Sequence, residues 1–282
     1  MGIILDGKQL SQKIKEELKV EVDLLKQKGI NPKLAVIMVG NDKGSAVYVK
    51  NKSKACEKVG IEFEEFLFDE NITQEELMNK INELNQDSSI TGILLQSPIP
   101  RHLDEQMAFN AILPEKDVDG FNPINVGKLS IGNDAFISCT PFGIVKILEE
   151  YKIETEGKHA VIIGRSNIVG KPMAQCLLEK NATVTICHSR TKNLQEITKQ
   201  ADILVVAMGK PKFITKEFVK DGAVIIDVGI NRLDDGKICG DVDFESVVDG
   251  SSYITPVPGG VGPMTIAMLM YNVVKAAKNN MN

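Results

Sequence analysis

A tyrosine and a lysine four positions apart, Tyr48 and Lys52, form the first residue pair in the chain with the chemistry of an active site. On a helix this spacing places both side chains on one face, where a phenol can stack on a planar ligand and an amine can move a proton. The Y-x-x-x-K spacing is also common on plain surface helices. Gln96 adds a second signal, because it closes the apolar run Gly92–Gln96, and α/β proteins bind ligands at the carboxyl ends of buried strands.

Residues 160–170 have the pattern of a phosphate-binding turn. The apolar run Ala160–Ile163 predicts a buried parallel strand, Gly164 permits a tight turn after it, and Gly170 lets the following helix pack closely. The start of such a helix offers backbone N–H groups and a positive dipole end to a pyrophosphate. Ser166 stands where the usual G-x-G-x-x-G pattern has its second glycine, so an ordinary strand–turn–helix corner is the alternative.

The end of the next predicted strand indicates which dinucleotide would bind. Thr183–Cys187 is followed by His188–Thr191, which includes Ser189 and Arg190, whereas NAD-binding units usually carry an Asp or Glu there for the ribose hydroxyl. Small polar and cationic groups suit a 2′-phosphate instead, and Arg165 in the glycine turn adds a guanidinium with bidentate geometry. The sequence therefore favours NADP over NAD, with a solvated loop charge as the alternative for Arg190.

Two loops carry further candidate residues. The acidic loop Pro114–Phe121 could grip an amino-pyrimidine edge with one of its carboxylates, or it could be a solvated turn. The segment Tyr253–Thr265 contains three prolines and three glycines within eight residues. Such a segment buries little and exposes its backbone, which suits a ligand that approaches the main chain closely.

The elements that must position these residues alternate between strand and helix, which indicates an α/β protein with parallel sheets. We predict helices at Gln9–Lys28, Tyr48–Val59, from the Thr73–Glu76 capping box to about Leu84, from Thr140 as N-cap to Tyr151, and from Gly262 to about Lys278. We predict strands at Leu34–Val39, Ile61–Phe68, Gly92–Gln96, Ala160–Ile163, Thr183–Cys187, Ile203–Ala207 and Ala223–Asp227.

A loop-rich stretch over residues 114–139 interrupts the alternation, and we place the domain boundary there. The prediction is two α/β lobes around a cleft in which cofactor and substrate meet. Residues 1–139, completed by the C-terminal helix 264–282, form the first domain. Residues 140–263 form a Rossmann-type domain with a doubly wound parallel sheet.

Composition excludes several classes of protein. With 43% hydrophobic and 25% charged residues the 282-residue chain has an ordinary globular balance. The net charge of -5 argues against a nucleic-acid or anionic-membrane surface. No apolar stretch approaches the ~20 residues that span a bilayer, and Asp6 and Lys8 interrupt any signal-peptide core. Five scattered cysteines and three separated histidines predict reduced thiols and no metal site.

Seven segments of the chain resemble the methylenetetrahydrofolate dehydrogenase/methenyltetrahydrofolate cyclohydrolase family. They are YVKNKSKACEKVGI, GILLQSPIP, PEKDVDGFNPINVG, GRSNIVGKPM, CHSRTKNL, DVGINR and TPVPGGVGPMT, in that family's order and spacing. The resemblance covers essentially the whole chain. It departs from the family's pattern at Ser97 and Ile99, where leucines are usual, and at the variable positions Asn122 and Ile124.

The resemblance implies a bifunctional enzyme of one-carbon metabolism and purine biosynthesis. Such an enzyme oxidises 5,10-methylenetetrahydrofolate to the 5,10-methenyl form by hydride transfer to NADP, and then hydrolyses that product to 10-formyltetrahydrofolate. The family also implies a cytoplasmic homodimer that binds one-carbon derivatives of tetrahydrofolate and no metal.

The same resemblance assigns roles to individual residues. Lys52 is the catalytic residue, Gln96 is its hydrogen-bond partner, and Tyr48 stacks on the folate. Repulsion by the cation that forms on the one-carbon bridge, together with partial burial, favours a neutral Lys52 amine that accepts a proton from the attacking water. The remaining positions are Asp119 at the pterin, Pro258 and Gly259 in the folate pocket, and Gly164, Arg165, Ser166, Ser189, Ile230 and Thr255 around the nucleotide.

Three other functions are compatible with some of these residues. A short-chain dehydrogenase also has a Tyr-x-x-x-Lys pair, but in that family the pair follows the nucleotide motif, whereas Tyr48 and Lys52 precede Gly164 by more than a hundred residues. A dehydrogenase that has lost the hydrolytic step is disfavoured because Lys52 and Gln96 are present together. A non-catalytic nucleotide- or folate-binding module is disfavoured because Lys52 is intact.

Overall fold

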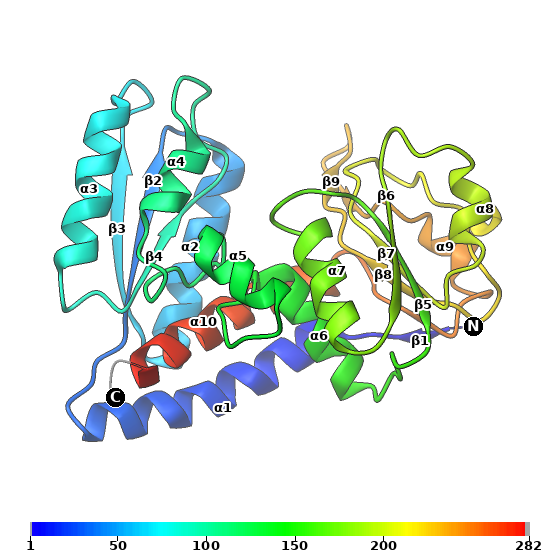
Figure 1. Ribbon diagram of the computed structural model, residues 1–282, viewed down its shortest axis with the longest axis horizontal. Helices are drawn as coiled ribbons and strands as arrows, with labels where there is room; N and C mark the ends of the chain where they lie inside the picture. Colours follow the sequence, from blue (N-terminus) through cyan, green and yellow to red (C-terminus); the bar gives the residue numbers. More distant parts are fainter. Residues whose placement is uncertain (1, 280–282) are drawn as a thin grey trace. The chain divides into compact units, whose positions relative to one another are not determined.

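The structure is a computed structural model that describes residues 2–279, and the chain divides into two compact units. Unit 1 contains the chain up to Ser11 together with Ser138–Thr265. Unit 2 contains Gln12–Ile137 together with the chain from Ile266 onward. Two long helices, α1 (Gly7–Gln27) and α10 (Val261–Asn279), each begin in unit 1 and end in unit 2 (Figure 1).

Unit 1 is built on a six-stranded parallel sheet with the order β1-β11-β8-β7-β5-β6. From β5 the chain moves outward to β6 and then returns to the other side of β5 to form β7, so the strand order reverses between β5 and β7. This is the doubly wound arrangement that the sequence predicts. The strands are β1 Ile3–Ile4, β5 His159–Ile163, β6 Thr183–Cys187, β7 Ile203–Val206, β8 Val224–Asp227 and β11 Tyr253–Ile254.

Helices cover both faces of this sheet, which explains why its central strands are apolar and buried along nearly their whole length. Helices α6 (Cys139–Glu150) and α7 (Gly170–Glu179) lie on one side (Figure 1). The short helices α8 (Leu194–Thr198) and α9 (Phe244–Val247) pack their apolar side chains into the core on the other side. The unit also contains a 3-10 turn, η1 (Lys216–Phe218), and an antiparallel ribbon of β9 (Asn231–Arg232) and β10 (Ile238–Cys239).

The first strand explains why the first eleven residues lie in unit 1, whereas the sequence placed residues 1–139 in one domain. Strand β1 pairs in parallel with β11, with Ile3 opposite Tyr253 and Ile4 opposite Ile254. The backbone N–H of Leu5 continues the pairing by donating to the carbonyl of Ile254. A two-residue strand is too short to show any periodicity, so its pairing is decided by the distant partner.

Unit 2 has a smaller parallel sheet of three strands in the order β3-β2-β4. The central strand β2 and its neighbour β4 pack apolar side chains against two helices, and these residues form the core of the unit. The elements are β2 Lys33–Val39, β3 Glu62–Phe68, β4 Gly92–Leu95, α2 Lys43–Val59, α3 Gln74–Gln86, α4 Glu105–Ala111 and α5 Pro123–Ser130. The predicted capping box of Thr73 and Glu76 is confirmed at the start of α3.

Two local details differ from the prediction. The loop-rich stretch 114–139 also contains a helix, α5, which begins with Asn122 as its N-cap and Pro123 in its first turn. Helix α6 begins at Cys139, so Thr140 is not its N-cap. The helix starts two residues earlier than predicted, with Ser138 as its N-cap, and the Thr140 hydroxyl lies 2.9 Å from that of Thr265 on α10. None of the helices within residues 2–279 has the length and apolar character needed to span a bilayer.

Candidate functional site

The predicted pair of Lys52 and Gln96 is in direct contact in unit 2. Lys52 lies on α2, and Gln96 follows β4, where its backbone N–H donates to the carbonyl of Ile37. The Nζ of Lys52 donates to the Oε1 of Gln96 at 2.9 Å. The amide of Gln96 is 9% exposed, and its Nε2 donates to the carbonyl of Ser97 at 2.6 Å. Because that carbonyl can only accept, it turns the amide oxygen toward the lysine.

Tyr48 lies one helical turn before Lys52 and is 40% exposed. Partial burial raises the pKa of its phenol, so the ring stays neutral and keeps its proton. Cys56, one turn after Lys52, is fully buried, and burial raises the pKa of its thiol to about 12, although Lys52 opposes this shift. Cys56 is therefore not a nucleophile. The exposed ring of Tyr48 and the amine of Lys52 are thus the groups on α2 whose chemistry suits stacking and proton transfer.

The acidic loop is folded around one carboxylate, that of Asp117. This side chain is almost completely buried and accepts hydrogen bonds from the backbone N–H groups of residues 120–122 at 2.8–3.1 Å. The Nδ2 of Asn125 donates to it at 2.8 Å. Burial raises the pKa of Asp117 to about 6, against the opposing effect of these hydrogen bonds. Asp117 is thus a structural residue that holds the loop.

Asp119 is half-buried at the tip of this loop. The carbonyl of the preceding Val118 accepts from the Nδ2 of Asn272 on α10 at 2.8 Å. A parallel bridge between Ile93 and Asp117 ties the loop to β4. Since Gln96 follows the same strand, the loop and the Lys52–Gln96 pair are both supported by β4.

The glycine turn of unit 1 requires both of its glycines. Gly164 has a φ of 141°, and a Cβ there would clash with the carbonyl oxygen of Ala207. A Cβ on Gly170, the first residue of α7, would clash with the carbonyl of Gly164. Ser166 accepts from the backbone N–H of Val169 at 3.1 Å, so the serine in the motif caps the helix start. Residues 165–168 are all exposed.

The turn after β6 lies beside the glycine turn. Ile163 and Cys187 are opposite each other in register, so the two loops leave the sheet at the same edge. The hydroxyl of Thr191 accepts from the backbone N–H of His188 at 2.9 Å, which fixes the turn locally. Ser189 and Arg190 are exposed in it. The structure therefore brings the two predicted arginine-bearing loops to one edge of the sheet, each with its polar side chains in solvent.

The other predicted residues of unit 1 differ in exposure. Ile230 is 50% exposed after β8. Thr255 is 1% exposed, and its hydroxyl accepts from the backbone N–H of Asp227 at 2.8 Å, so this side chain fastens the backbone after β11 to β8. Pro258 is exposed, and the carbonyl of Gly259 accepts from the backbone N–H of Lys8 at 2.8 Å. These four residues belong to unit 1, whereas Lys52, Gln96, Tyr48 and Asp119 belong to unit 2.

Sequence reasoning missed two carboxylates of unit 1, Asp227 and Asp241, which are 4% and 0% exposed. Asp227 ends β8 and Asp241 lies after β10. Aspartates in glycine-rich segments are typical of ordinary turns. The sequence feature that points to these two is therefore the abundance of glycine around them, in DVGINR and CGDVDF. Burial raises the pKa of Asp227 to about 6, with Asp241 adding to the shift.

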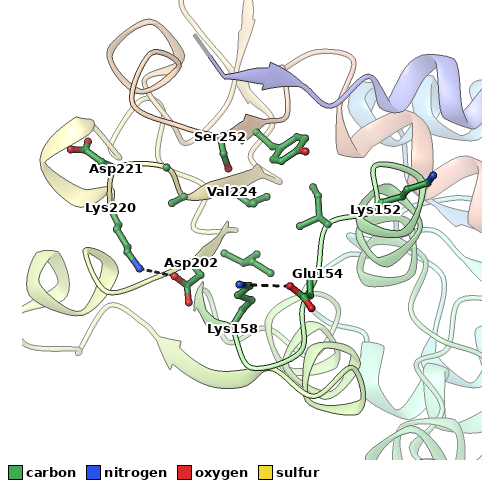
Figure 2. Close-up of a pocket in the computed structure, with 13 residues that line it drawn as sticks. Lys152, Glu154, Lys158, Asp202, Lys220, Asp221, Val224 and Ser252 are labelled. Atoms are coloured by element: carbon green, nitrogen blue, oxygen red, sulfur yellow. Dashed lines mark hydrogen bonds and ion pairs between the residues drawn. The ribbon is translucent and has the colours of Figure 1, made fainter.

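A pocket of about 380 Å³ in unit 1 lies away from these residues, at the amino ends of β7, β8 and β11 (Figure 2). Four of its charged groups form two ion pairs: Lys220 with Asp202 at 2.6 Å, and Lys158 with Glu154 at 3.9 Å. The lining includes none of the predicted site residues. The carboxyl edge of the sheet, and not this pocket, therefore has the features of a nucleotide-binding site.

Comparison with known proteins identifies relatives over the whole chain. Residues 5–119 match the model of the tetrahydrofolate dehydrogenase/cyclohydrolase catalytic domain, and residues 138–281 match that of the NAD(P)-binding domain of the same family. The bifunctional protein FolD of Acetivibrio thermocellus is 60% identical over 98% of this chain and 96% of its own length.

Two solved structures are similar in fold and sequence. The bifunctional FolD methylenetetrahydrofolate dehydrogenase/cyclohydrolase of Campylobacter jejuni superimposes with a TM-score of 0.98 at 56% identity, covering 99% of this chain and 100% of that one. The methylenetetrahydrofolate dehydrogenase-cyclohydrolase of Trypanosoma brucei, complexed with NADP and an inhibitor, has a TM-score of 0.96 at 36% identity, covering 100% and 99%.

Proposed function

The chain belongs to the tetrahydrofolate dehydrogenase/cyclohydrolase family, and from this premise we propose that Lys52 is its catalytic residue and that Gln96 orients it. The protein is a bifunctional enzyme of one-carbon metabolism. It oxidises 5,10-methylenetetrahydrofolate to 5,10-methenyltetrahydrofolate with NADP and hydrolyses that product to 10-formyltetrahydrofolate. The observation that carries the assignment of residues is the hydrogen bond between Lys52 and Gln96.

Hydrolysis requires a group that takes a proton from the water as its oxygen adds to the cationic one-carbon bridge. In its neutral form the Lys52 amine can donate an N–H to Gln96 and accept this proton on its lone pair. Gln96 is uncharged, so it directs the amine while stabilising the ammonium form less than a carboxylate would. Its own orientation is held by the carbonyl of Ser97. The two residues therefore supply a positioned general base next to the carboxyl end of β4.

We propose that unit 2 binds the folate through Tyr48 and Asp119. The neutral phenol ring of Tyr48 is exposed on the same face of α2 as Lys52 and offers a stacking surface. Asp119, held at the tip of a loop that Asp117 folds, accepts hydrogen bonds from the amino groups of the pterin. Pro258 and Gly259 contribute backbone to the folate pocket in this proposal.

The residues of unit 1 fit a nicotinamide dinucleotide. The exposed stretch 165–168 precedes the first turn of α7, where N–H groups and the helix dipole favour a pyrophosphate. When bound, the cofactor supplies the hydride acceptor for the oxidation. We propose that Arg165, Ser189 and Arg190 bind the 2′-phosphate and so favour NADP over NAD. Gly164, Ser166 and Ile230 surround the nucleotide, while Thr255 supports it through the backbone of β8 rather than through its hydroxyl.

The same premise supports proposals on the domains, assembly and cellular role of the enzyme. Residues 1–139 with the C-terminal helix are proposed as the folate and catalytic domain, apart from the first eleven residues, which lie in the NADP-binding unit. We further propose that the enzyme is a cytoplasmic homodimer and that its 10-formyltetrahydrofolate serves purine biosynthesis. Sedimentation equilibrium of the purified protein tests the dimer, and a single species at 30.9 kDa would rule it out.

One assay tests the two activities together. Purified enzyme is mixed with 5,10-methylenetetrahydrofolate and either NADP or NAD, and reduced cofactor and methenyl product are followed by absorbance. A separate reaction starts from the methenyl compound without any nucleotide and follows its loss. We expect both reactions, with NADP the better cofactor. Reduction without loss of the methenyl compound would identify a dehydrogenase alone, and inactivity in both reactions would refute the function.

A further inference from the structure

The carboxylate of Asp241 accepts hydrogen bonds from three consecutive backbone N–H groups of one loop. Its Oδ2 accepts from the N–H groups of Met208 and Gly209 at 2.8 and 2.9 Å, and its Oδ1 accepts from that of Lys210 at 2.8 Å. The Nδ2 of Asn231 also donates to Oδ1 at 2.8 Å. A fully buried side chain thus makes four hydrogen bonds, which suits an ionised carboxylate with two acceptor oxygens.

Asp227 holds Asp241 in place. Its Oδ1 accepts from the backbone N–H groups of Gly229 and Asp241 at 2.9 and 3.0 Å, and its Oδ2 accepts from that of Val242 at 2.9 Å. The segments approach so closely that a Cβ on Gly229 would clash with Asp241, and one on Gly240 would clash with Asp227. The glycines near these two aspartates are therefore required by the network itself.

The loops held by this network leave the sheet at the same edge as the glycine turn. Residues 208–210 follow β7, and Gly229 to Asn231 follow β8. Strands β5, β7 and β8 are neighbours and parallel, so their carboxyl ends lie together. The contact between Gly164 and Ala207 joins the glycine turn to the residue just before Met208. Dinucleotides bind at such an edge, beside the reversal of strand order between β5 and β7.

We propose that Asp241 is a positioning residue for the NADP site, because its buried carboxylate sets the shape of the loops after β7 and β8 on which the cofactor rests. This inference depends on the proposed function of unit 1. Asp241 does not itself touch the cofactor. It acts by holding the backbone of residues 208–210 and the side chain of Asn231, and thereby the adjacent Ile230.

An asparagine at position 241 would have nearly the same shape but only one acceptor oxygen. Whichever way its amide turned, two of the four donors would face an NH₂ group instead of an acceptor. Hydrogen bonds to a charged group are the stronger kind, and donors left buried without an acceptor are costly. The loops would therefore relax away from the shape seen here.

The test compares Asp241→Asn with wild-type enzyme in NADP binding and in nucleotide-free hydrolysis of methenyltetrahydrofolate. We expect the dissociation constant and KM for NADP to rise roughly 10- to 100-fold, with kcat at saturating NADP and the hydrolysis rate near those of wild type. Asp202→Asn is the matched control, because Asp202 also accepts a backbone N–H, that of His159 at 2.9 Å, but at the amino end of the sheet. This control should bind NADP normally.

A second variant covers the case in which Asp241→Asn does not fold. Asn231→Leu removes a single donor to the carboxylate, and we expect a smaller increase in the NADP dissociation constant with normal hydrolysis. Wild-type affinity for NADP in a folded Asp241→Asn would overturn the inference. The inference would also be overturned if Asp241→Asn lost both hydrolysis and NADP binding while Asn231→Leu kept wild-type hydrolysis and wild-type affinity for NADP. Failure of wild-type enzyme to bind NADP would instead refute the proposed function.

Discussion

The Nζ of Lys52 lies 2.9 Å from the Oε1 of Gln96, although 44 positions separate the two residues in the chain. Lys52 lies on helix α2, and Gln96 directly follows the carboxyl end of β4. The Nε2 of Gln96 donates to the carbonyl of Ser97. Lys52 therefore has an uncharged partner of fixed orientation, which suits the role of general base that we propose for it.

Replacing Lys52 by methionine removes the amine and keeps most of the side-chain length. Because the proposed base is lost, hydrolysis of methenyltetrahydrofolate should fall by a factor on the order of 10² to 10⁴, while NADP binding is unchanged. Stopped assays that follow the loss of methenyltetrahydrofolate with wild-type enzyme and with Lys52→Met measure this decrease in rate. Lys54→Met, an exposed lysine on the same helix, is the control and should retain full activity. Wild-type hydrolysis in Lys52→Met would rule out the role of this residue.

Replacing Gln96 by glutamate keeps an oxygen acceptor for Lys52 but adds a negative charge. The charge stabilises the ammonium form of the lysine, and the carboxylate cannot donate to the Ser97 carbonyl. We expect hydrolysis at neutral pH to fall roughly 10- to 100-fold and to recover in part as the pH is raised. A pH–rate profile of the variant checks both points, and an unchanged profile would contradict the orienting role of the amide.

Replacing Arg165 by alanine should weaken binding of NADP more than binding of NAD. The guanidinium lies in an exposed loop at the edge where the turn after β6 also begins, and a charged hydrogen bond to a phosphate contributes roughly 1.5–3 kcal/mol. Titration calorimetry with each cofactor gives the two affinities. Arg101→Ala, an exposed arginine of unit 2, serves as the comparison. Equal losses for NADP and NAD would show that Arg165 makes no contact with the 2′-phosphate.

Asp117 should titrate near pH 6 in the folded protein, because its burial raises the pKa to about 6 from an ordinary value of 3.8. Between these two values the folded chain keeps a proton that the unfolded chain has lost. The stabilisation from this group is thus complete below about pH 4 and is lost as the pH rises through about 6, with a magnitude on the order of 3 kcal/mol. Carbon-13 NMR of aspartate carboxyl groups measures the midpoint, and one near 4 for Asp117 would contradict this environment.

Much of the fold could be predicted because its signals are local. The strand Thr183–Cys187 has the predicted bounds, and the capping box of Thr73 and Glu76 begins α3 as expected. Helix α2 begins at Lys43 rather than at the predicted Tyr48, because the carboxylate of Asp42 caps it by accepting the N–H of Ser45. The errors thus occur mainly at element ends, where a single side chain decides the boundary.

The sequence by itself determined the family, the two activities, the alternation of strands and helices, and the glycines that the turn after β5 requires. These follow from motifs and periodicities that are complete within a short window of the chain. Only the tertiary structure decided that Asp117 folds the acidic loop, that Thr255 is turned inward, that β1 joins β11, and that Asp241 gathers the loop after β7. Burial and pairing between segments far apart in sequence depend on which surfaces pack against each other. A short sequence pattern does not predict those contacts.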